Sequence, residues 1–372
     1  MLSMSEAVSP RAEPGTIVVA EIGTAHGGDA AKGRELVAAA VEAGAQVVKF
    51  QHVYAAEIIH PATGMVPLPG GPVALYERFV ALQTSPVFLA EMKSEVEARG
   101  AVFLCTPFGL RSARELRDLG VTAMKVASPE LNHLPLLDEV AGYGLPVILS
   151  TGVSTLGDIE EALSRFRVGG VALLHCVTAY PAPEEDYNLA LVPLLAGLLG
   201  VPVGVSDHSM DPVLVPALAA ARGARFVEKH ICLSRRDEGL DDPIALPPED
   251  FRRMVDAMRE AEQLGREAAE DALAARYGRE KVMATLGDGV KRLAPSELAN
   301  YGLTNRSLHA TRAIPAGAAI GPRDVAVLRT EKVLRPGLAP AMLDVVVGRI
   351  AARDIDDGQG IGWDDLGARA VG

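Results

Sequence analysis

The chain has 372 residues and a formal net charge of −12, from 48 acidic and 36 basic side chains. This acidity argues against a nucleic-acid-binding surface, which needs a broad excess of positive charge, but leaves room for a local anion pocket. Hydrophobic residues make up 49% of the chain and aromatic residues only 4%, so Ala, Val and Leu must fill a large core. No apolar run reaches the roughly 18 residues of a membrane span.

The three cysteines, Cys105, Cys176 and Cys232, are odd in number and have no CxxC spacing. Each lies in or beside an apolar run, which predicts buried thiols in a reducing, cytoplasmic setting rather than disulfides. Residues 1–15 contain charges and prolines without an apolar segment, so we expect a flexible tail there and no signal peptide.

From residue 16 to residue 265, short apolar runs alternate with longer amphipathic stretches. Eight runs are predicted strands: Ile17–Ile22, Val47–Gln51, Val102–Cys105, Ala123–Val126, Val147–Ser150, Val171–Cys176, Val203–Ser206 and Phe226–His230. Most of them are almost entirely apolar, which is typical of parallel strands that are buried on both faces. The predicted helices between them include Lys32–Ala43, Ser85–Arg99, Ser112–Leu119 and Thr155–Arg167.

Eight such β/α units in about 250 residues predict a (β/α)8 TIM barrel. A helix over Pro248–Leu264 would close it. The alternative is a doubly wound sheet, but residues 21–28 after the first strand do not fit the GxGxxG phosphate-binding pattern. We predict a charged linker over residues 266–300, followed by a small β-rich domain over residues 301–372.

Polar side chains gather where the eight predicted strands end. They are Glu21, Lys49, Gln51, Thr106, Lys125, Ser128, Glu130, Ser150, Thr151, His175, Tyr180, Ser206, Asp207, His208, Glu228, Lys229 and His230. The carboxyl ends of barrel strands share one face, and active sites of TIM barrels are built on it. A single strand-end lysine is more often a paired structural residue, so the argument depends on the agreement of all eight ends.

His208 and His230 end the last two predicted strands, which are neighbours in a barrel. Two imidazoles that converge suit a divalent ion such as Mn, Co, Zn or Fe, although two hydrogen-bonded core histidines would give the same pattern. Lys49 and Lys125, with nearby hydroxyl groups, suit a phosphate and a carboxylate. Together these features indicate condensation or lyase chemistry on a phosphorylated small acid. Alternatively, Lys125 could form a Schiff base, as in a class I aldolase.

Several segments match a known family in order along nearly the whole chain. They are AEIGTAHGGD (20–29), AGAQVVKFQ (43–51), TPF (106–108), KVASPELN (125–132), PVILSTGVS (146–154), LLHCVTAYPAP (173–183), VGVSDHS (203–209) and EKH (228–230). On these segments the chain resembles the sialic acid synthase family, which condenses phosphoenolpyruvate with an N-acyl-hexosamine. From TLGDGVK (285–291) through NRSLHATRAIPAGAAI (305–320), it resembles the antifreeze-like (SAF) domain of that family.

The resemblance implies a role for each matching residue. It places a divalent metal, Mn2+ before Mg2+ or Co2+, on His208 and His230. It implies phosphoenolpyruvate contacts for Lys49, Thr106, Lys125, Ser128, Ser150 and Ser206. It implies that the amino-sugar acceptor or the reacting centre is faced by Glu21, Gln51, Glu130, Tyr180 and Asp241. It further implies that the catalytic groups are Glu21, Glu130 and Lys125. It implies that Arg306 of a partner subunit contacts the acyl group, in a domain-swapped homodimer.

The chain departs from the family pattern mainly at positions that would face the acceptor. Ala25-His26 replaces a frequent Asn-His pair, Gly239–Asp242 keeps Asp241 but lacks a histidine, the loop Pro61–Pro72 lacks an asparagine, and Thr178 replaces Ser or Asn. The reaction class is therefore better supported than the acceptor. One alternative is a sugar-phosphate acceptor, for which Arg235-Arg236 would bind the second phosphate. Another is a sugar-binding relative without catalytic activity.

Overall fold

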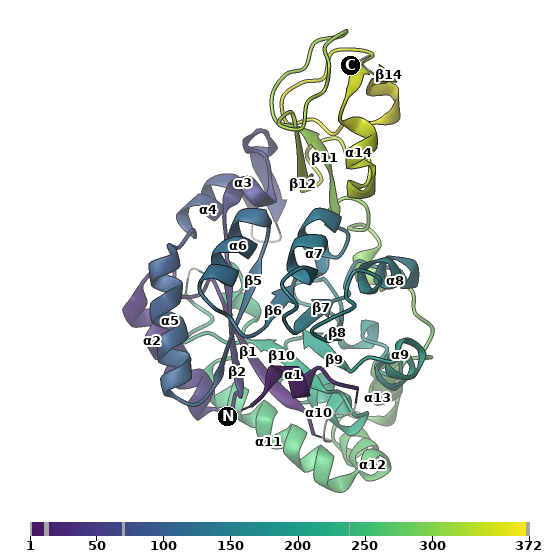
Figure 1. Cartoon of the computed structure of the whole chain (residues 1–372). Helices are drawn as coiled ribbons and strands as arrows, with labels where there is room; N and C mark the ends of the chain where they lie inside the picture. Colours follow the sequence, from purple (N-terminus) through teal and green to yellow (C-terminus); the bar gives the residue numbers. More distant parts are fainter. Residues whose placement is uncertain (1, 11–14, 69–70, 238, 370–372) are drawn as a thin grey trace.

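A computed structural model describes residues 2–10, 15–68, 71–237 and 239–369 (Figure 1). Its centre is a closed barrel of eight parallel strands in the order β1-β10-β9-β8-β7-β6-β5-β2. The strands are β1 (Ile17–Gly23), β2 (Val47–His52), β5 (Val102–Pro107), β6 (Met124–Val126), β7 (Val147–Ser150), β8 (Val171–Cys176), β9 (Val203–Asp207) and β10 (Phe226–His230). Each lies at a predicted strand, so the predicted TIM barrel is confirmed.

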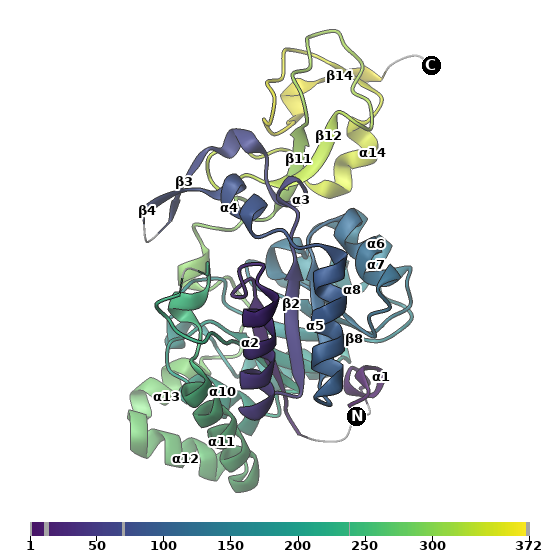
Figure 2. The same cartoon turned by 90° about the vertical axis from the view of Figure 1, so that its left-hand side faces the viewer.

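Helices surround the barrel, as Figures 1 and 2 show from two sides. They are α2 (Ala30–Glu42), α5 (Pro86–Ala98), α6 (Leu110–Asp118), α7 (Leu134–Ala141), α8 (Leu156–Leu163), α9 (Leu191–Leu199), α10 (Leu214–Ala221) and α11 (Pro248–Leu264). Helix α5 begins as its sequence predicts: the Ser85 side chain accepts the Phe88 N–H, and Pro86 takes the first helical position, where its missing N–H costs nothing. None of the described helices combines the length and the apolar character of a membrane span.

Part of the segment that was predicted as a flexible tail, residues 2–10, packs on the barrel. Residues 4–7 form helix α1 (Met4–Ala7), and Met4, Ala7 and Val8 are buried. They pack against strand residues at the amino end of the barrel, among them Val19 and Phe226. A single helical turn carries too few apolar residues to stand out from the surrounding charges, which explains the error.

The predicted linker is also largely helical. It contains α12 (Arg266–Tyr277) and α13 (Arg279–Leu286), whose residues Leu273, Val282 and Leu286 are buried in the main core. The charged residues that suggested a linker lie on the outer faces of these helices. The connection to the last domain therefore begins near residue 287.

An excursion between β2 and α5 covers one side of the barrel mouth. It contains α3 (Ala55–Ile58), the hairpin strands β3 (Met65–Leu68) and β4 (Gly71–Ala74), and α4 (Leu75–Ala81). The segment Pro61–Pro72, predicted as a loop, thus contributes to a two-stranded sheet. Figure 2 shows this excursion extending from the barrel toward the carboxyl-terminal domain.

The carboxyl-terminal domain has its own small core. It contains β11 (Arg306–Ala310), β12 (Val325–Arg329), α14 (Leu343–Val346), β13 (Arg349–Ala351) and β14 (Leu366–Arg369), with its strands in two two-stranded antiparallel sheets. Leu308, Ile320 and Ile361 are buried between them. The predicted small β-rich domain is confirmed. It touches the excursion, where Ile59 pairs with Arg329 of β12.

Candidate active site

Strand register brings the predicted residues of β9 and β10 together. Glu228 pairs with Ser206, and the next residues along, Lys229 and Asp207, pair as well. Successive side chains of a strand point to opposite faces. Ser206 and Glu228 therefore share one face and are hydrogen-bonded, whereas the Asp207–Lys229 ion pair, 2.6 Å long and fully buried, lies on the other. That second pair fixes the two strands without taking part in the site.

A chain of charged groups links β10, β2 and β1 across the barrel mouth. The Lys49 ammonium lies 2.7 Å from Glu228 and 3.1 Å from Glu21, and the Gln51 amide donates to Glu21 at 2.7 Å. Glu228 was named only as a strand-end residue, yet it forms the centre of this cluster with Lys49 and Ser206. Its position two residues before His230, on the same strand face, was the signal that could have assigned it a role.

The two carboxyl groups of this cluster differ in their proton affinity. Burial raises the pKa of Glu21 to about 7; Lys49 opposes the effect, and Glu228 adds to it. Burial also acts to raise the pKa of Glu228, but Lys125 and Lys49 outweigh it and bring that pKa to about 2. Glu228 is therefore a permanent anion, whereas Glu21 can gain or lose a proton near neutral pH, as a general acid or base must.

Hydroxyl and ammonium donors lie beside this cluster. Lys125 is buried and donates to Ser150 Oγ at 2.5 Å and to the Val126 carbonyl at 2.9 Å; burial lowers its pKa to about 8. The Thr106 hydroxyl is buried and has no hydrogen-bond partner among the described residues. A buried polar group without a partner is costly, and a ligand oxygen would remove the cost. The donor set suits the phosphate and carboxylate of one small acid.

The two predicted metal ligands lie side by side. The ring centres of His208 and His230 are 5.6 Å apart. His208 Nδ1 is 2.9 Å from the Val177 carbonyl, which assigns one hydrogen to Nδ1 and leaves Nε2 as the nitrogen that would bind an ion. Tyr180 packs on His208 at 4.3 Å between ring centres, and Asp241 lies 3.8 Å from His230 Nδ1.

This pair fits a catalytic rather than a structural metal. Among the described residues no group of three or more His, Cys, Asp or Glu gathers to form a complete cage. Two imidazoles would hold the ion and leave positions open for solvent or substrate, as in catalytic sites. Burial lowers the pKa of His230 well below its usual value. Burial also acts to lower the pKa of His208, but Cys176 and Val177 raise it to about 9, so an incoming ion would displace a proton there.

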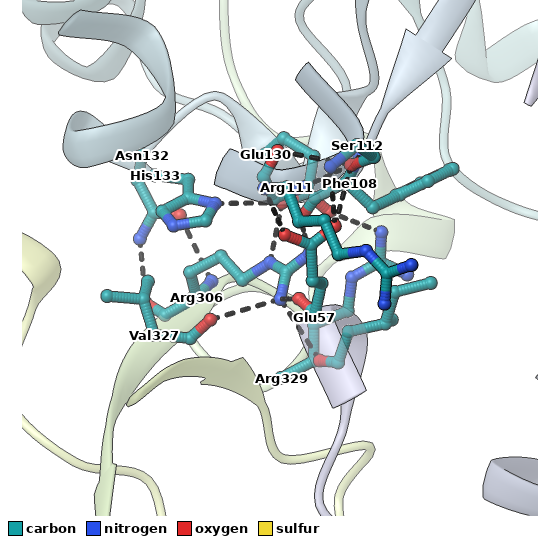
Figure 3. Close-up of polar contacts among 12 residues, drawn as sticks. Glu57, Phe108, Arg111, Ser112, Glu130, Asn132, His133, Arg306, Val327 and Arg329 are labelled. Atoms are coloured by element: carbon teal, nitrogen blue, oxygen red, sulfur yellow. Dashed lines mark hydrogen bonds and ion pairs between the residues drawn. The ribbon is translucent and has the colours of Figure 1, made fainter. Parts of the chain in front are cut away.

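Glu130, predicted to be catalytic, lies instead in the interface between the barrel and the carboxyl-terminal domain (Figure 3). It is fully buried, and its two oxygens accept hydrogen bonds from Arg306 and Arg329. Burial acts to raise its pKa, but the two guanidinium groups hold it far below the usual carboxyl range. A carboxylate that is always ionised and doubly paired is unavailable for proton transfer.

Arg306 is fully engaged in the same interface. Its other guanidinium nitrogens donate to the carbonyl oxygens of Glu57, Ile58, Phe108 and Val327. Its backbone N–H and C=O both bond to the Asn132 amide. Arg306 therefore fastens the domain to the barrel of its own chain, and the structure does not bring it to an acceptor.

A cavity of about 750 Å³ lies at the amino end of the barrel, beside Thr16, Arg225 and Glu262, but holds none of the predicted site residues. A second cavity, of about 440 Å³, lies between the barrel mouth, the excursion and the carboxyl-terminal domain. It brings together the predicted residues Gln51, Tyr180 and Asp241. Its polar wall also includes Arg329, Glu331 and Lys332, which sequence reasoning missed; their position at the end of a strand, β12, was the available signal. Its apolar wall contains Val53, Ile58, Val66, Phe79, Phe108 and Leu240.

Comparison with known proteins gives consistent results. Residues 36–269 match the NeuB family, and residues 305–367 match the SAF domain. The chain is 32% identical over 355 residues to the spore coat polysaccharide biosynthesis protein SpsE of Bacillus subtilis, covering 94% of this chain and 93% of that protein. It is 30% identical over 373 residues to an N,N'-diacetyllegionaminic acid synthase of Legionella pneumophila, covering 97% and 98%. The crystal structure of SpsE matches with a TM-score of 0.79, 31% identity and 97% coverage of both chains. The chain belongs to the NeuB family and ends in a SAF domain, which confirms the resemblance to sialic acid synthases.

Proposed function

We propose that the protein is a nonulosonic acid synthase, which condenses phosphoenolpyruvate with an N-acylated amino-sugar aldehyde and releases phosphate. The observation that carries the proposal is one barrel mouth that holds the His208–His230 pair beside the donor groups of Lys49, Lys125 and Thr106. Relatives over nearly the full chain are named legionaminic and pseudaminic acid synthases, which supports it.

In the proposed reaction, C3 of phosphoenolpyruvate attacks the aldehyde carbon, water adds at C2, and phosphate leaves by C–O cleavage. Lys49, Lys125 and Ser150 bind the anionic groups and stabilise their charge. Glu21 exchanges a proton with the new hydroxyl group or with the attacking water, because its pKa of about 7 allows both directions. A divalent ion on His208 and His230, Mn2+ before Mg2+ or Co2+, would supply Lewis acidity toward the aldehyde oxygen.

The 440 Å³ cavity favours an unphosphorylated acceptor, such as N-acetylmannosamine or a related acylamino sugar. Its apolar wall suits acyl methyl groups, and Tyr180, Gln51 and Asp241 suit hydroxyl groups. A sugar phosphate would need a further basic cluster, but Arg235 donates to the Ala245 carbonyl and does not line the cavity. Of the two basic residues that do line it, Arg329 is paired with Glu130, and Lys332 lies near the carboxylate of Glu331. The set of metal and anion residues also weighs against a binding protein without catalytic activity.

The domain-swapped homodimer and the cytoplasmic location remain predictions. In this chain the SAF domain docks on its own barrel through Arg306 and Glu130. Exchange of identical domains between two chains would preserve each of these contacts, so both arrangements use the same interface.

A panel of acceptors tests the proposal. Purified protein with Mn2+ and phosphoenolpyruvate is incubated with N-acetylmannosamine, its 6-phosphate or a 2,4-diacetamido sugar, and phosphate release and product mass are measured. We expect turnover with an unphosphorylated sugar and none with the His208→Ala variant. Turnover with the 6-phosphate alone would support the sugar-phosphate alternative, and no turnover with any acceptor would support the binding protein.

A further inference from the structure

Residues 291–305 connect the barrel helices to the SAF domain and lie almost entirely between the two family matches, which end at residue 269 and resume at residue 305. In Figure 1 this segment is part of the light-green trace that runs from α13 past α8 to β11. At its centre is Glu297, which is 1% exposed. A carboxylate buried this deeply in a connecting segment needs a structural or functional reason.

Glu297 bonds to the loops that follow two adjacent barrel strands. Its Oε1 accepts the backbone N–H of Val153, after β7, at 2.8 Å and that of Thr178, after β8, at 2.7 Å. Its Oε2 accepts the N–H of Ala294 in its own turn at 3.2 Å. Hydrogen bonds to a charged acceptor are stronger than neutral ones, and without this acceptor the buried N–H of Val153 and the partly buried N–H of Thr178 would lack a partner.

The loop after β7 has a strained shape that depends on this segment. Val153 has a φ of 45°, a left-handed conformation that a β-branched residue rarely adopts. The segment holds both of its polar groups, because Glu297 accepts its N–H and Asn305 donates to its carbonyl at 3.1 Å. Next to it, Gly152 has no room for a side chain, since a Cβ would lie 2.0 Å from Thr178 Oγ1 and 3.1 Å from Glu297 Oε1.

The same loop forms part of the anion pocket. The Gly152 N–H donates to Ser128 Oγ at 3.0 Å, and Ser150 lies two residues earlier, in contact with Lys125. A shift of this loop would therefore move two hydroxyl donors at once. We infer that Glu297 is a positioning residue for the phosphoenolpyruvate subsite, and that the connecting segment completes this subsite. The inference rests on the proposed function.

Three substitutions in the full-length protein, assayed with Mn2+, test the inference. Glu297→Ala removes the acceptor, Glu297→Asp keeps the charge but shortens the reach, and Glu297→Gln keeps a carbonyl oxygen that can accept both N–H groups. We expect Ala and Asp to raise the KM for phosphoenolpyruvate by about tenfold or more, with the acceptor KM changed by less than about twofold. Glu297→Gln should raise this KM less than Ala and Asp do, because its carbonyl oxygen can replace Oε1, whereas its NH2 group cannot accept the Ala294 N–H.

Asp365→Ala is the matched control, because Asp365 is a fully buried carboxylate in the SAF domain that accepts the Gly362 N–H and pairs with two arginines. It should lower the melting temperature without changing the phosphoenolpyruvate KM. Calorimetric titration with phosphoenolpyruvate gives a second readout, independent of turnover. If Glu297→Asp melts lower but binds phosphoenolpyruvate as wild type does, the positioning role is overturned and the proposed function stands. If wild-type protein fails to bind phosphoenolpyruvate, the proposed function itself is overturned.

Discussion

Glu21 and Glu130 are both buried at the mouth of the same barrel, yet their surroundings have opposite effects on their protonation. Glu21 shares one ammonium, that of Lys49, with a second carboxylate, so burial prevails and its pKa rises to about 7. Glu130 receives two guanidinium groups, of which that of Arg329 also faces a second carboxylate, Glu331, and its pKa falls far below the usual range. The number of cations per carboxylate, rather than burial, separates a group that exchanges protons from one that fastens two domains.

The surrounding regions follow the same division. On the Glu21 side, Nε2 of His208 is left to face an ion and the Thr106 hydroxyl lacks a partner among the described residues, so we expect this region to bind an ion and substrate. On the Glu130 side, nearly all donors of Arg306 are used within the protein. Substitutions on the first side should therefore affect the reaction, and substitutions on the second should affect domain docking and stability.

The largest expected effect concerns the region around Glu21, which includes the two histidines. Turnover should fall to background in the His208→Ala variant, in the His230→Ala variant and after removal of metal by EDTA. The reason is that an ion held by two imidazoles would lose half of its protein ligands in either variant. Mn2+, Co2+ or Mg2+ should restore the chelated wild-type protein but neither variant. The measurement is phosphate release, with bound metal quantified by elemental analysis. Full activity of metal-free protein would refute the assignment.

Paired substitutions test the contrast directly. Glu21→Gln should lower kcat by about 10²–10⁴-fold, the usual contribution of a general acid or base, with little loss of stability. Glu130→Gln should lower the free energy of unfolding by about 3–5 kcal/mol, because it leaves the buried guanidinium of Arg306 without a carboxylate partner. Denaturant unfolding and kcat are measured for both variants. The contrast fails if Glu130→Gln is stable but inactive.

The fold was largely predictable, because parallel strands buried on both faces give apolar runs that periodicity reveals, and barrel topology then collects their ends. The role of Glu130 was not predictable by that reasoning. Its partners Arg306 and Arg329 lie 176 and 199 residues away along the chain, so no local pattern reports the ion pairs that suppress its basicity. Glu297 has the same difficulty: its partners are 144 and 119 residues away.

Acid should weaken the Glu130 side selectively. The folded pKa of Glu130 lies below its unfolded value of about 4.3, so its contribution to stability is present above that pH and is lost as pH falls. Below pH of about 4, wild-type protein should lose up to about 1.4 kcal/mol more per pH unit than Glu130→Gln. Both proteins carry the neighbouring His133. The difference between their free energies of unfolding, measured as a function of pH, therefore reports on Glu130 alone. If the free energy of unfolding falls equally with pH in both proteins, the ion-pair assignment is contradicted.

Lys125→Ala should raise the KM for phosphoenolpyruvate by about tenfold or more and change the acceptor KM much less, because one charge-assisted hydrogen bond is worth about 1.5–3 kcal/mol. The pKa of Lys125, lowered to about 8, would also suit a Schiff base. Borohydride treatment in the presence of substrate, followed by mass spectrometry, separates the two roles. A covalent adduct on Lys125 would show that this lysine forms a Schiff base, as in an aldolase, and would contradict the anion-binding role.

The last test asks from which chain the arginine paired with Glu130 comes. Arg306 and Glu130 belong to one chain in this structure, whereas the resemblance to the family implies that Arg306 of a partner subunit contacts the acyl group of the acceptor. In a swapped dimer, an Arg306→Ala chain supplies an intact barrel and a His208→Ala chain supplies an intact SAF domain. After subunit exchange, half of the dimers would be mixed, each with one complete site. Each variant assayed alone gives the baseline, and we expect the mixture to exceed the sum of the two baselines by up to about one quarter of the wild-type activity. Circular dichroism must first show that both variants are folded, and labelled subunits must show that exchange occurs. With exchange demonstrated, an inactive mixture means that each SAF domain serves its own barrel, and the connecting segment held by Glu297 then never leaves its own chain.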